Sequence, residues 1–251
     1  MSTRWLQQYE PRPTAPLRLV CFPHAGGSAA FYRNWATHET SDLEVLAVQY
    51  PGRMNRLDEP LIDETGAMAD TLAGVLAHSV PAPFAFFGHS MGATIAFETA
   101  QRLARNHLPH PVRLFASARK GPACHKPGRR HLANDEAIVA YLRKLGGCET
   151  EVFQQPQLLP MILPIIRSDF KLSETWAPLP GAHIDCPITA FVGDEDSEVT
   201  IEEAASWRRA SDHFEMRVFR GHHFYLLDHR PDVIDHVVRR CGEDLHKRLA
   251  A

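Results

Sequence analysis

The chain has 251 residues, of which 44% are hydrophobic and 23% charged, and its formal net charge is -3. This length suits one large α/β domain or one domain with an insertion. The small net charge gives no reason to expect nucleic acid or an anionic membrane as a partner. No apolar run reaches the length of a membrane-spanning helix, and residues 1–5 lack the apolar core of a signal peptide.

The cysteines and histidines indicate neither a disulfide framework nor a metal site. The chain has 5 cysteines, an odd number, with no C-x-x-C pair among them. This usage predicts reduced thiols and a cytoplasmic protein. Its 15 histidines show no H-E-x-x-H or similar spacing, so we expect no metal ligands among them. The cysteines are Cys21, Cys124, Cys148, Cys186 and Cys241.

Apolar runs typical of buried strands alternate with helical patterns along most of the chain. This alternation predicts a mostly parallel central sheet flanked by helices on both faces. The predicted strands lie at 17–22, 43–48, 84–87, 112–116, 188–192 and 214–219. The predicted helices lie between them, at 28–36, 64–79, 93–105 and 233–241, with a further helix opened by a capping box of Thr200 and Glu203.

One stretch, residues 121–185, interrupts the alternation. It shows helical patterns at 136–145 and 158–172, separated by Gly146 and Gly147, and no convincing strand. A helical hairpin packed on the core is one interpretation. A lid is the favoured one, because the insertion follows the C-terminal end of a strand, where such folds bind ligands. We therefore expect a core formed by 1–120 and 186–251 with an inserted helical lid at 121–185.

The sequence Gly88-His89-Ser90-Met91-Gly92 stands between a predicted strand and a predicted helix. A G-x-S-x-G motif in this context is typical of the nucleophile elbow of an α/β-hydrolase, whereas a plain glycine-rich turn is the competing interpretation. The flanking glycines permit a tight turn, and the helix N-terminus favours developing negative charge. The motif predicts Ser90 as the nucleophile.

An acid and a base are expected after later strands, in the order serine, acid, histidine. Asp194 and Asp196 follow the strand at 188–192, and Asp196 is favoured because its spacing from Gly193 is the commoner hydrolase arrangement. His222 and His223 follow the strand at 214–219. His223 is favoured because the apolar run after it can fix its ring, which leaves His222 a supporting or surface role.

An oxyanion hole needs backbone N–H groups that point at the reacting carbonyl oxygen. The N–H of Met91, directly after the nucleophile, is one expected donor. The other is expected from the loop at 23–27, where Ala25 is favoured over His24 and the following glycines permit close approach of substrate. His24 itself is given no chemical role.

Taken together, the motifs resemble the type II thioesterases of polyketide and non-ribosomal peptide biosynthesis. The resemblance extends over about residues 17–238. It is carried by the segments at 22–28, 50–53, 88–92, 141–147, 166–170, 193–196 and 221–224, with Arg56, Glu59, Pro60, Glu174 and Trp207.

By this resemblance the catalytic triad is Ser90, Asp196 and His223, and the insertion corresponds to the helical lid of the family. The resemblance implies hydrolysis of acyl groups from the phosphopantetheine arm of acyl or peptidyl carrier proteins, which removes stalled or aberrant chains. It implies no cofactor, because the substrate carries the phosphopantetheine, and a carrier protein as partner. We further expect a monomer, and an acyl chamber lined by the apolar face of the lid at Ile162, Ile166 and Phe170.

The same triad also suits a general serine esterase, an acyltransferase or a type I release domain, which is normally fused to a synthase. A non-catalytic carrier-protein binder is the alternative from a different class, and the intact Ser90, Asp196 and His223 argue against it. The carrier proteins that are this family's partners are typically acidic. Basic loop residues are therefore candidates for docking the carrier protein, and ordinary solvated charges are the competing interpretation. They are Arg53, Arg56, Arg119, Lys120, Arg129 and Arg130.

Overall fold

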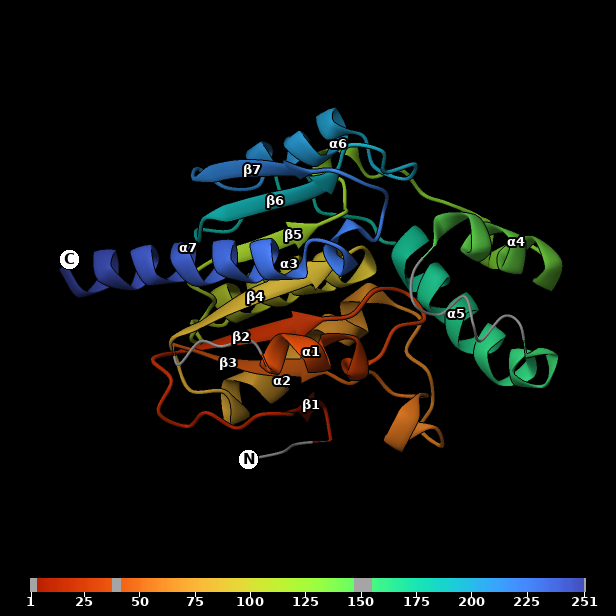
Figure 1. Ribbon diagram of the computed structural model, residues 1–251, viewed down its shortest axis with the longest axis horizontal. Helices are drawn as coiled ribbons and strands as arrows, with labels where there is room; N and C mark the ends of the chain where they lie inside the picture. The colour runs from red at the N-terminus through yellow and green to blue at the C-terminus, as the bar shows by residue number, and fades with distance from the viewer. Residues whose placement is uncertain (1–3, 38–41, 147–154, 251) are drawn as a thin grey trace.

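A seven-stranded, mostly parallel sheet forms the centre of the computed structural model, which describes residues 4–37, 42–146 and 155–250. The strand order is β1-β3-β2-β4-β5-β6-β7, and β1 alone runs antiparallel to its neighbour, β3 (Figure 1). The strands are β1 (Leu6–Gln7), β2 (Leu17–Phe22), β3 (Leu43–Val48), β4 (Phe84–His89), β5 (Leu114–Ser117), β6 (Ile188–Gly193) and β7 (Phe214–Phe219).

Helices cover both faces of this sheet, as its continuous apolar strands require. Side chains of a strand alternate between faces, so Phe86 and Phe87 of β4 belong to separate apolar clusters. Phe86 shares its cluster with residues of α2 (Thr65–Ser79) and α3 (Met91–Arg105). Phe87 shares its cluster with residues of α1 (Arg33–Ala36) and α7 (Arg230–Ala250). The short helix α6 (Ile201–Ala205) packs on β6 and β7.

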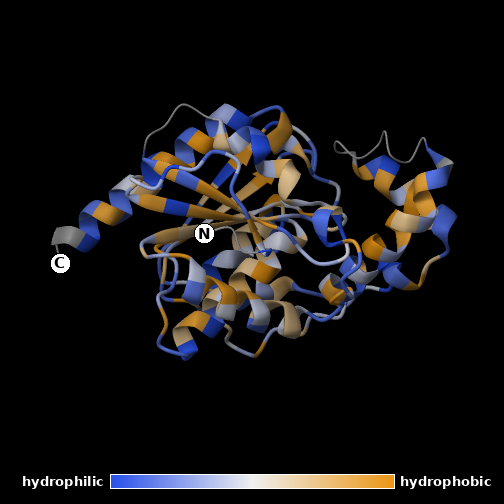
Figure 2. Ribbon diagram, turned by 90° about the horizontal axis from the view of Figure 1, so that it is seen from below, coloured by the Kyte–Doolittle hydropathy of each residue, from blue (hydrophilic) through white to orange (hydrophobic). Residues whose placement is uncertain are grey.

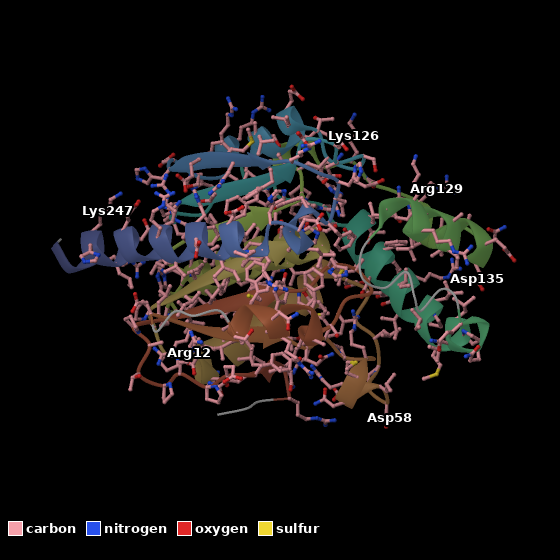
Figure 3. The ribbon with its side chains drawn as sticks, viewed as in Figure 1. Arg12, Asp58, Lys126, Arg129, Asp135 and Lys247 are labelled. Carbon is pink, nitrogen blue, oxygen red and sulfur yellow. The ribbon has the colours of Figure 1, made fainter. Side chains whose placement is uncertain are left out.

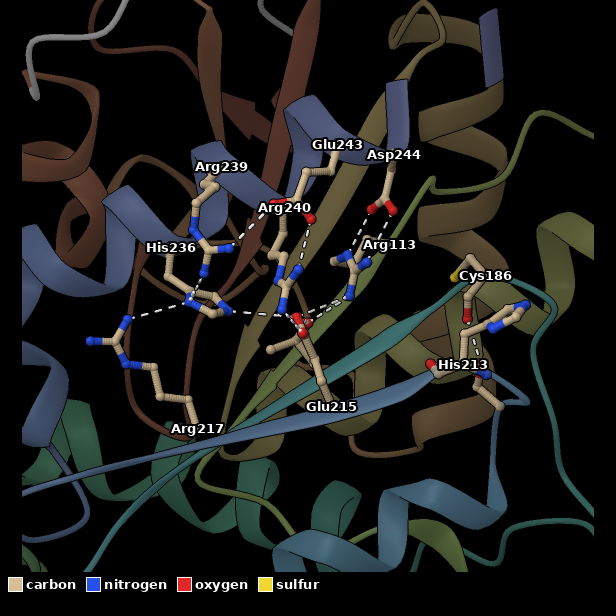
Figure 4. Close-up of polar contacts among 12 residues, drawn as sticks. Arg113, Cys186, His213, Glu215, Arg217, His236, Arg239, Arg240, Glu243 and Asp244 are labelled. Atoms are coloured by element: carbon tan, nitrogen blue, oxygen red, sulfur yellow. Dashed lines mark hydrogen bonds and ion pairs between the residues drawn. The ribbon is translucent and has the colours of Figure 1, made fainter. Parts of the chain in front are cut away.

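The last helix, α7, is held to the sheet by an ionic network (Figure 4). Arg113, just before β5, binds both carboxylate oxygens of Asp244 on α7, at 2.6 and 3.0 Å. Arg113 also donates to Thr189 at 2.8 Å and to Glu215 of β7 at 3.2 Å. Glu215 pairs in turn with Arg240 of α7. The apolar pattern predicted α7 only as far as residue 241. Polar contacts of Asp244 hold the part of the helix beyond that residue.

The helices α4 (Asp135–Leu145) and α5 (Leu159–Glu174) lie beyond the end of the sheet (Figure 1). They are amphipathic, with apolar and polar residues on different sides of each helix (right of Figure 2). Their apolar sides meet in a cluster of Ile138, Val139, Leu142, Leu163, Ile166 and Phe170. The described part of 121–185 contains no strand. Gly147 and Cys148, named in the sequence analysis, lie outside the described residues.

Helix α5 belongs to two packing units. Its residues Leu163 and Ile166 face α4, whereas Leu172, near its end, lies in the core cluster of the sheet with Trp176, and Thr65 of α2 donates to the Leu172 carbonyl at 2.7 Å. Pro164 stands inside the helix, where it removes a backbone hydrogen bond. The insertion is therefore anchored to the core through the C-terminal part of α5.

The predicted strands correspond to β2 through β7, with ends that differ by a few residues at most. The predicted helix at 28–36 divides into a 3-10 turn (Ala29–Tyr32) followed by α1, and the capping box of Thr200 and Glu203 is confirmed. β1, with two residues, is too short for a periodic signal. Further 3-10 turns are Met54–Arg56, Pro122–Cys124, Arg130–Leu132, Pro156–Leu158, Ser206–Arg209 and Tyr225–Leu227.

Within the described ranges, no helix combines the length and the apolar character needed to cross a membrane.

Candidate active site

Ser90 occupies a strained turn between β4 and α3. Its backbone has φ 53° and ψ -118°, a conformation that residues other than glycine rarely adopt. The Ser90 N–H donates to the carbonyl of Ser117 at 2.8 Å, which fixes the turn against β5. A Cβ on Gly88 would lie 2.4 Å from the Gly92 oxygen, and one on Gly92 would lie 2.0 Å from the Phe22 oxygen. Backbone contact on both sides thus explains both glycines of the motif.

His223 and Asp196 lie together on the loops that follow β7 and β6. Nδ1 of His223 is 2.9 Å from Oδ2 of Asp196, and both side chains are buried. Oδ1 of Asp196 accepts the backbone N–H groups of Glu198 and Val199, at 2.8 and 3.2 Å. The carboxylate is therefore fixed by backbone donors and orients the imidazole, so that Nε2 is the ring nitrogen available for proton transfer.

The alternative acid and base have other contacts. Oδ1 of Asp194 accepts the Gly221 N–H at 2.8 Å, which ties the two loops together. The side chain of His222 is 74% exposed and its Nδ1 lies 3.1 Å from the Glu195 carbonyl. Of the four residues, the structure brings only Asp196 and His223 together as a buried carboxylate–imidazole pair.

Ser90 and His223 line one pocket with both expected oxyanion-hole residues, Ala25 and Met91. Met91 is the first residue of α3, so its N–H lies at a helix N-terminus. Among the described residues, no hydrogen bond joins the Ser90 hydroxyl to His223. Catalytic hydrogen bonds often form only when substrate is bound. The arrangement of the pocket favours the catalytic roles of Ser90 and His223, which stay predictions.

Aromatic and imidazole rings pack against one another beside His223 and the loop at 23–27. The His24 ring centroid lies 4.7 Å from that of Phe31 and 4.9 Å from that of Phe224, so His24 packs beside the loop. The ring of His89 lies 5.3 Å from that of His223. Burial, followed by the nearby His223, holds the pKa of His89 well below its usual range. His89 is therefore neutral and adds no positive charge beside His223.

The predicted lid residues occupy different positions. Phe170 lines the Ser90 pocket together with Tyr141 of α4. Ile166 is 1% exposed and lies in the cluster between α4 and α5, against which Ile162 packs. The structure thus brings Phe170, and not the isoleucines, to the wall of this pocket.

Arg53 and Arg56 are buried, so their prediction as exposed docking residues is wrong. Arg53, 5% exposed, donates to both oxygens of Asp169 at 2.8 and 2.9 Å and to the Gly27 carbonyl at 3.0 Å. Arg56, 3% exposed, donates to the Gln49 carbonyl at 2.7 Å and pairs with Glu59. Their guanidinium groups are used inside the protein.

Asp169, which the sequence analysis did not assign, joins α5 to the loop that carries Ala25. Besides its contacts with Arg53, the carboxylate accepts the Gly26 N–H at 2.7 Å, and the residue is 1% exposed. A signal existed in the sequence: Asp169 stands beside Phe170 and three residues after Ile166 in an apolar helix. A carboxylate on such a helix face needs a partner, since burying an unpaired charge is costly.

The described residues contain no group of three or more His, Cys, Asp and Glu side chains that could hold a metal ion. The pocket offers a serine hydroxyl, an imidazole and backbone N–H groups, which are the groups that nucleophilic catalysis with an oxyanion hole requires.

Comparisons with known proteins find thioesterases. A family model described as Thioesterase domain matches residues 17–241. A probable cadicidin biosynthesis thioesterase from Streptomyces griseus is 39% identical over 251 residues, which cover 100% of this chain and 68% of that protein. Thioesterase PikA5 from Streptomyces venezuelae is 38% identical over 250 residues, covering 96% and 88% of the two chains. The solved structure of the type II thioesterase BorB, from the borrelidin biosynthetic cluster, has a TM-score of 0.87 and 43% identity, covering 98% of this chain and 99% of that one.

The buried pair of Asp169 and Arg53 leads to a stability prediction. Asp169→Ala leaves the Arg53 guanidinium buried without its carboxylate, so the free energy of unfolding should fall by about 3–5 kcal/mol. The measurement is guanidinium chloride unfolding at 25 °C. Lys171→Ala is the matched control on the same helix, because it removes the exposed Lys171–Asp63 pair. The control should leave stability nearly unchanged, and equal losses in the two variants would contradict the assignment.

Proposed function

The chain belongs to the thioesterase domain family, and we propose that it is a type II thioesterase that hydrolyses acyl groups from the phosphopantetheine arm of acyl or peptidyl carrier proteins. The observation that carries the proposal is the strained Ser90 turn in one pocket with the buried Asp196–His223 pair. The names of the relatives support the substrate class, since PikA5 is a thioesterase and BorB is a type II thioesterase of a biosynthetic cluster.

The proposed reaction begins with attack by the Ser90 hydroxyl on the thioester carbonyl. Nε2 of His223 accepts the serine proton, and Asp196 stabilises the imidazolium through Nδ1. The N–H groups of Ala25 and Met91 bind the oxyanion of the tetrahedral intermediate. Collapse of the intermediate breaks the C–S bond and expels the pantetheine thiolate, a good leaving group that takes up the proton from His223.

The acyl-Ser90 ester is then hydrolysed by water. His223 takes a proton from the water as it attacks, and returns that proton to the Ser90 oxygen when the ester bond breaks. The contact between Asp169 and the Gly26 N–H supports both acylation and deacylation of Ser90, because it fixes the peptide beside Ala25 during each step.

Thioesterases of this family generally need no cofactor, and the proposed reaction uses none. One similar solved structure, YbtT, is a type II thioesterase from the yersiniabactin NRPS/PKS biosynthetic pathway, so a carrier protein of such a system is the proposed partner. The monomeric state and the cytoplasmic location stay predictions.

For the domain organisation we propose that residues 121–185 act as a lid. The C-terminal part of α5 attaches this lid to the core. The apolar contact of Leu172 and the Asp169–Arg53 pair support the anchor. The position of Phe170 beside Ser90 supports a role in contacting the acyl chain, whereas the substrate-binding roles of Ile162 and Ile166 stay predictions.

Removal of the nucleophile tests the proposal most directly. Ser90→Ala should lower kcat for a propionyl-carrier-protein thioester by about three or more orders of magnitude, because triad residues act as a unit. A fluorophosphonate probe should label the wild-type protein and not the variant, while circular dichroism shows that both are folded. Near-normal turnover by a folded Ser90→Ala protein would sink the assignment.

The roles of the acid and base are tested by paired substitutions. His223→Ala and Asp196→Asn should each lower kcat by about two or more orders of magnitude, since one removes the base and the other its charge partner. The matched controls His222→Ala and Asp194→Asn change neighbouring residues whose contacts lie outside this pair. Steady-state kinetics distinguish the two assignments. Losses in the controls as large as those in the first pair would show that the base and acid are wrongly assigned.

The lid assignment predicts a change in acyl-length preference. Phe170→Ala should raise the ratio of kcat/KM for decanoyl over propionyl thioesters, because it removes bulk from the pocket wall. Ile166→Ala, a control within the cluster between α4 and α5, should instead lower stability by about 2–5 kcal/mol. The measurements are kcat/KM across chain lengths and thermal unfolding. A shift in the ratio for Ile166→Ala as large as that for Phe170→Ala would assign the chamber to the isoleucines.

A further inference from the structure

Part of the wall of the Ser90 pocket is strongly charged. The cationic side chains on it come from the segment after β5, and the carboxylates come from the end of α5 and the loop after β6. A pocket that held only an uncharged acyl chain would need no such wall. The cationic residues are Arg119, Lys120, Lys126 and Arg130, and the acidic ones are Glu174 and Glu198.

Most of these charges already have partners inside the protein. Glu174 accepts the backbone N–H groups of Arg130 and His131, at 2.9 Å each, and contacts the His131 ring at 2.7 Å. Lys120 pairs with Glu203 at 2.8 Å. Arg130 lies 3.5 Å from Glu198 and places its guanidinium over the Tyr141 ring. The hydrogen bonds and ion pairs of Glu174 and Glu198 are thus made with groups other than Arg119 and Lys126, while both carboxylates act on Arg119 through space.

Arg119 has an unusual surplus of donors. A guanidinium carries five N–H groups. Among the described residues, Arg119 makes one hydrogen bond, from Nη2 to the Ser173 carbonyl, at 3.3 Å. Its Nε is buried with no partner, and within the described ranges no carboxylate lies within ion-pair distance of it. Burial lowers the pKa of Arg119 to about 10, so the group is still a cation at neutral pH.

Lys126 adds a second cation at the mouth of the pocket. Its side chain is exposed, and in the described structure it forms no ion pair. Figure 3 places Lys126 and Arg129 on the segment that leads from the sheet to α4. His125, between Arg119 and Lys126 in the pocket wall, adds no charge at pH 7, because burial lowers its pKa to about 4.

We propose that Arg119 and Lys126 form an anion subsite in the Ser90 pocket, which binds an oxyanion of the thioester substrate. The oxyanion is either a carboxylate on the acyl group or the phosphodiester of the phosphopantetheine arm. An anion there supplies an acceptor to a guanidinium whose buried Nε has no hydrogen-bond partner, and charge-assisted hydrogen bonds of this kind are strong. The inference rests on the proposed function, because it specifies the charge of the substrate bound at the same serine.

The experiment uses two pairs of thioesters that differ only by one anionic group. The acyl pair is malonyl-pantetheine and its monomethyl ester. The arm pair is propionyl-4′-phosphopantetheine and propionyl-pantetheine. In each pair, the ratio of kcat/KM for the charged over the uncharged substrate is measured at pH 7.5, with the uncatalysed hydrolysis subtracted. The ratio removes any general effect of a substitution on catalysis.

The variants are Arg119→Gln, Arg119→Lys and Lys126→Gln. Arg209→Gln is the matched control, because Arg209 is an exposed cation outside the pocket. Arg119→Gln should lower the ratio about tenfold in one pair, the value expected for loss of a charge-assisted hydrogen bond, and Arg119→Lys should restore part of it. Lys126→Gln changes an exposed side chain that the fold does not need, so it keeps the test valid if Arg119→Gln fails to fold.

The pair whose ratio falls identifies the source of the oxyanion. The proposal is overturned if neither ratio falls in Arg119→Gln and Lys126→Gln, or if Arg209→Gln lowers a ratio as much as they do. Failure of the proposed function gives a different result, since the wild-type protein would then leave all four thioesters unhydrolysed.

Discussion

One buried carboxylate, that of Asp169, joins the loop that carries Ala25 to two other parts of the protein. Asp169 binds the Arg53 guanidinium through both oxygens and the Gly26 N–H through one of them. These contacts join α5 of the insertion, the loop after β3 and the loop after β2. A buried ion pair is stable only when its remaining hydrogen-bonding capacity is filled, and here backbone groups on the β2 loop fill it. The position of Ala25, one residue before Gly26, depends on this arrangement.

The parallel sheet brings the three proposed catalytic residues to the same edge. Ser90 follows β4, Asp196 follows β6 and His223 follows β7, so each lies at the carboxyl end of its strand. Backbone contacts then set the details, because Gly193 and Gly221 allow the β6 and β7 loops to touch: a Cβ on Gly193 would lie 2.2 Å from the Gly221 oxygen. The geometry of the proposed active site is thus a property of loops packed backbone to backbone at the end of the sheet.

Local signals in the sequence were sufficient for the sheet and for the strained turn that holds Ser90. The strands are continuous apolar runs, and the Ser90 turn needs glycines at fixed positions, so both leave a pattern that is visible in a few residues. Asp196 could be favoured over Asp194 from its spacing to Gly193, and His223 over His222 from the apolar run after it. The contact between Asp196 and His223 joins residues that are 27 positions apart, which no local pattern shows. Arg53 was placed wrongly because arginine is usually exposed, and its partner Asp169 lies 116 positions away.

Helix α5 has consequences for how this protein can change over evolutionary time. The part before and around Pro164 contacts α4, and the part after it carries Asp169 and reaches the core through Leu172. Leu163 packs toward α4, whereas Phe170, which lines the Ser90 pocket, is the direct neighbour of Asp169 in the chain. A side chain of the pocket wall therefore stands next to the carboxylate that binds the Gly26 N–H. Substitutions at the α4 contact leave both residues in place, while a substitution at Phe170 acts beside the residue that fixes the loop at 23–27, so the pocket wall and this loop are constrained to change together.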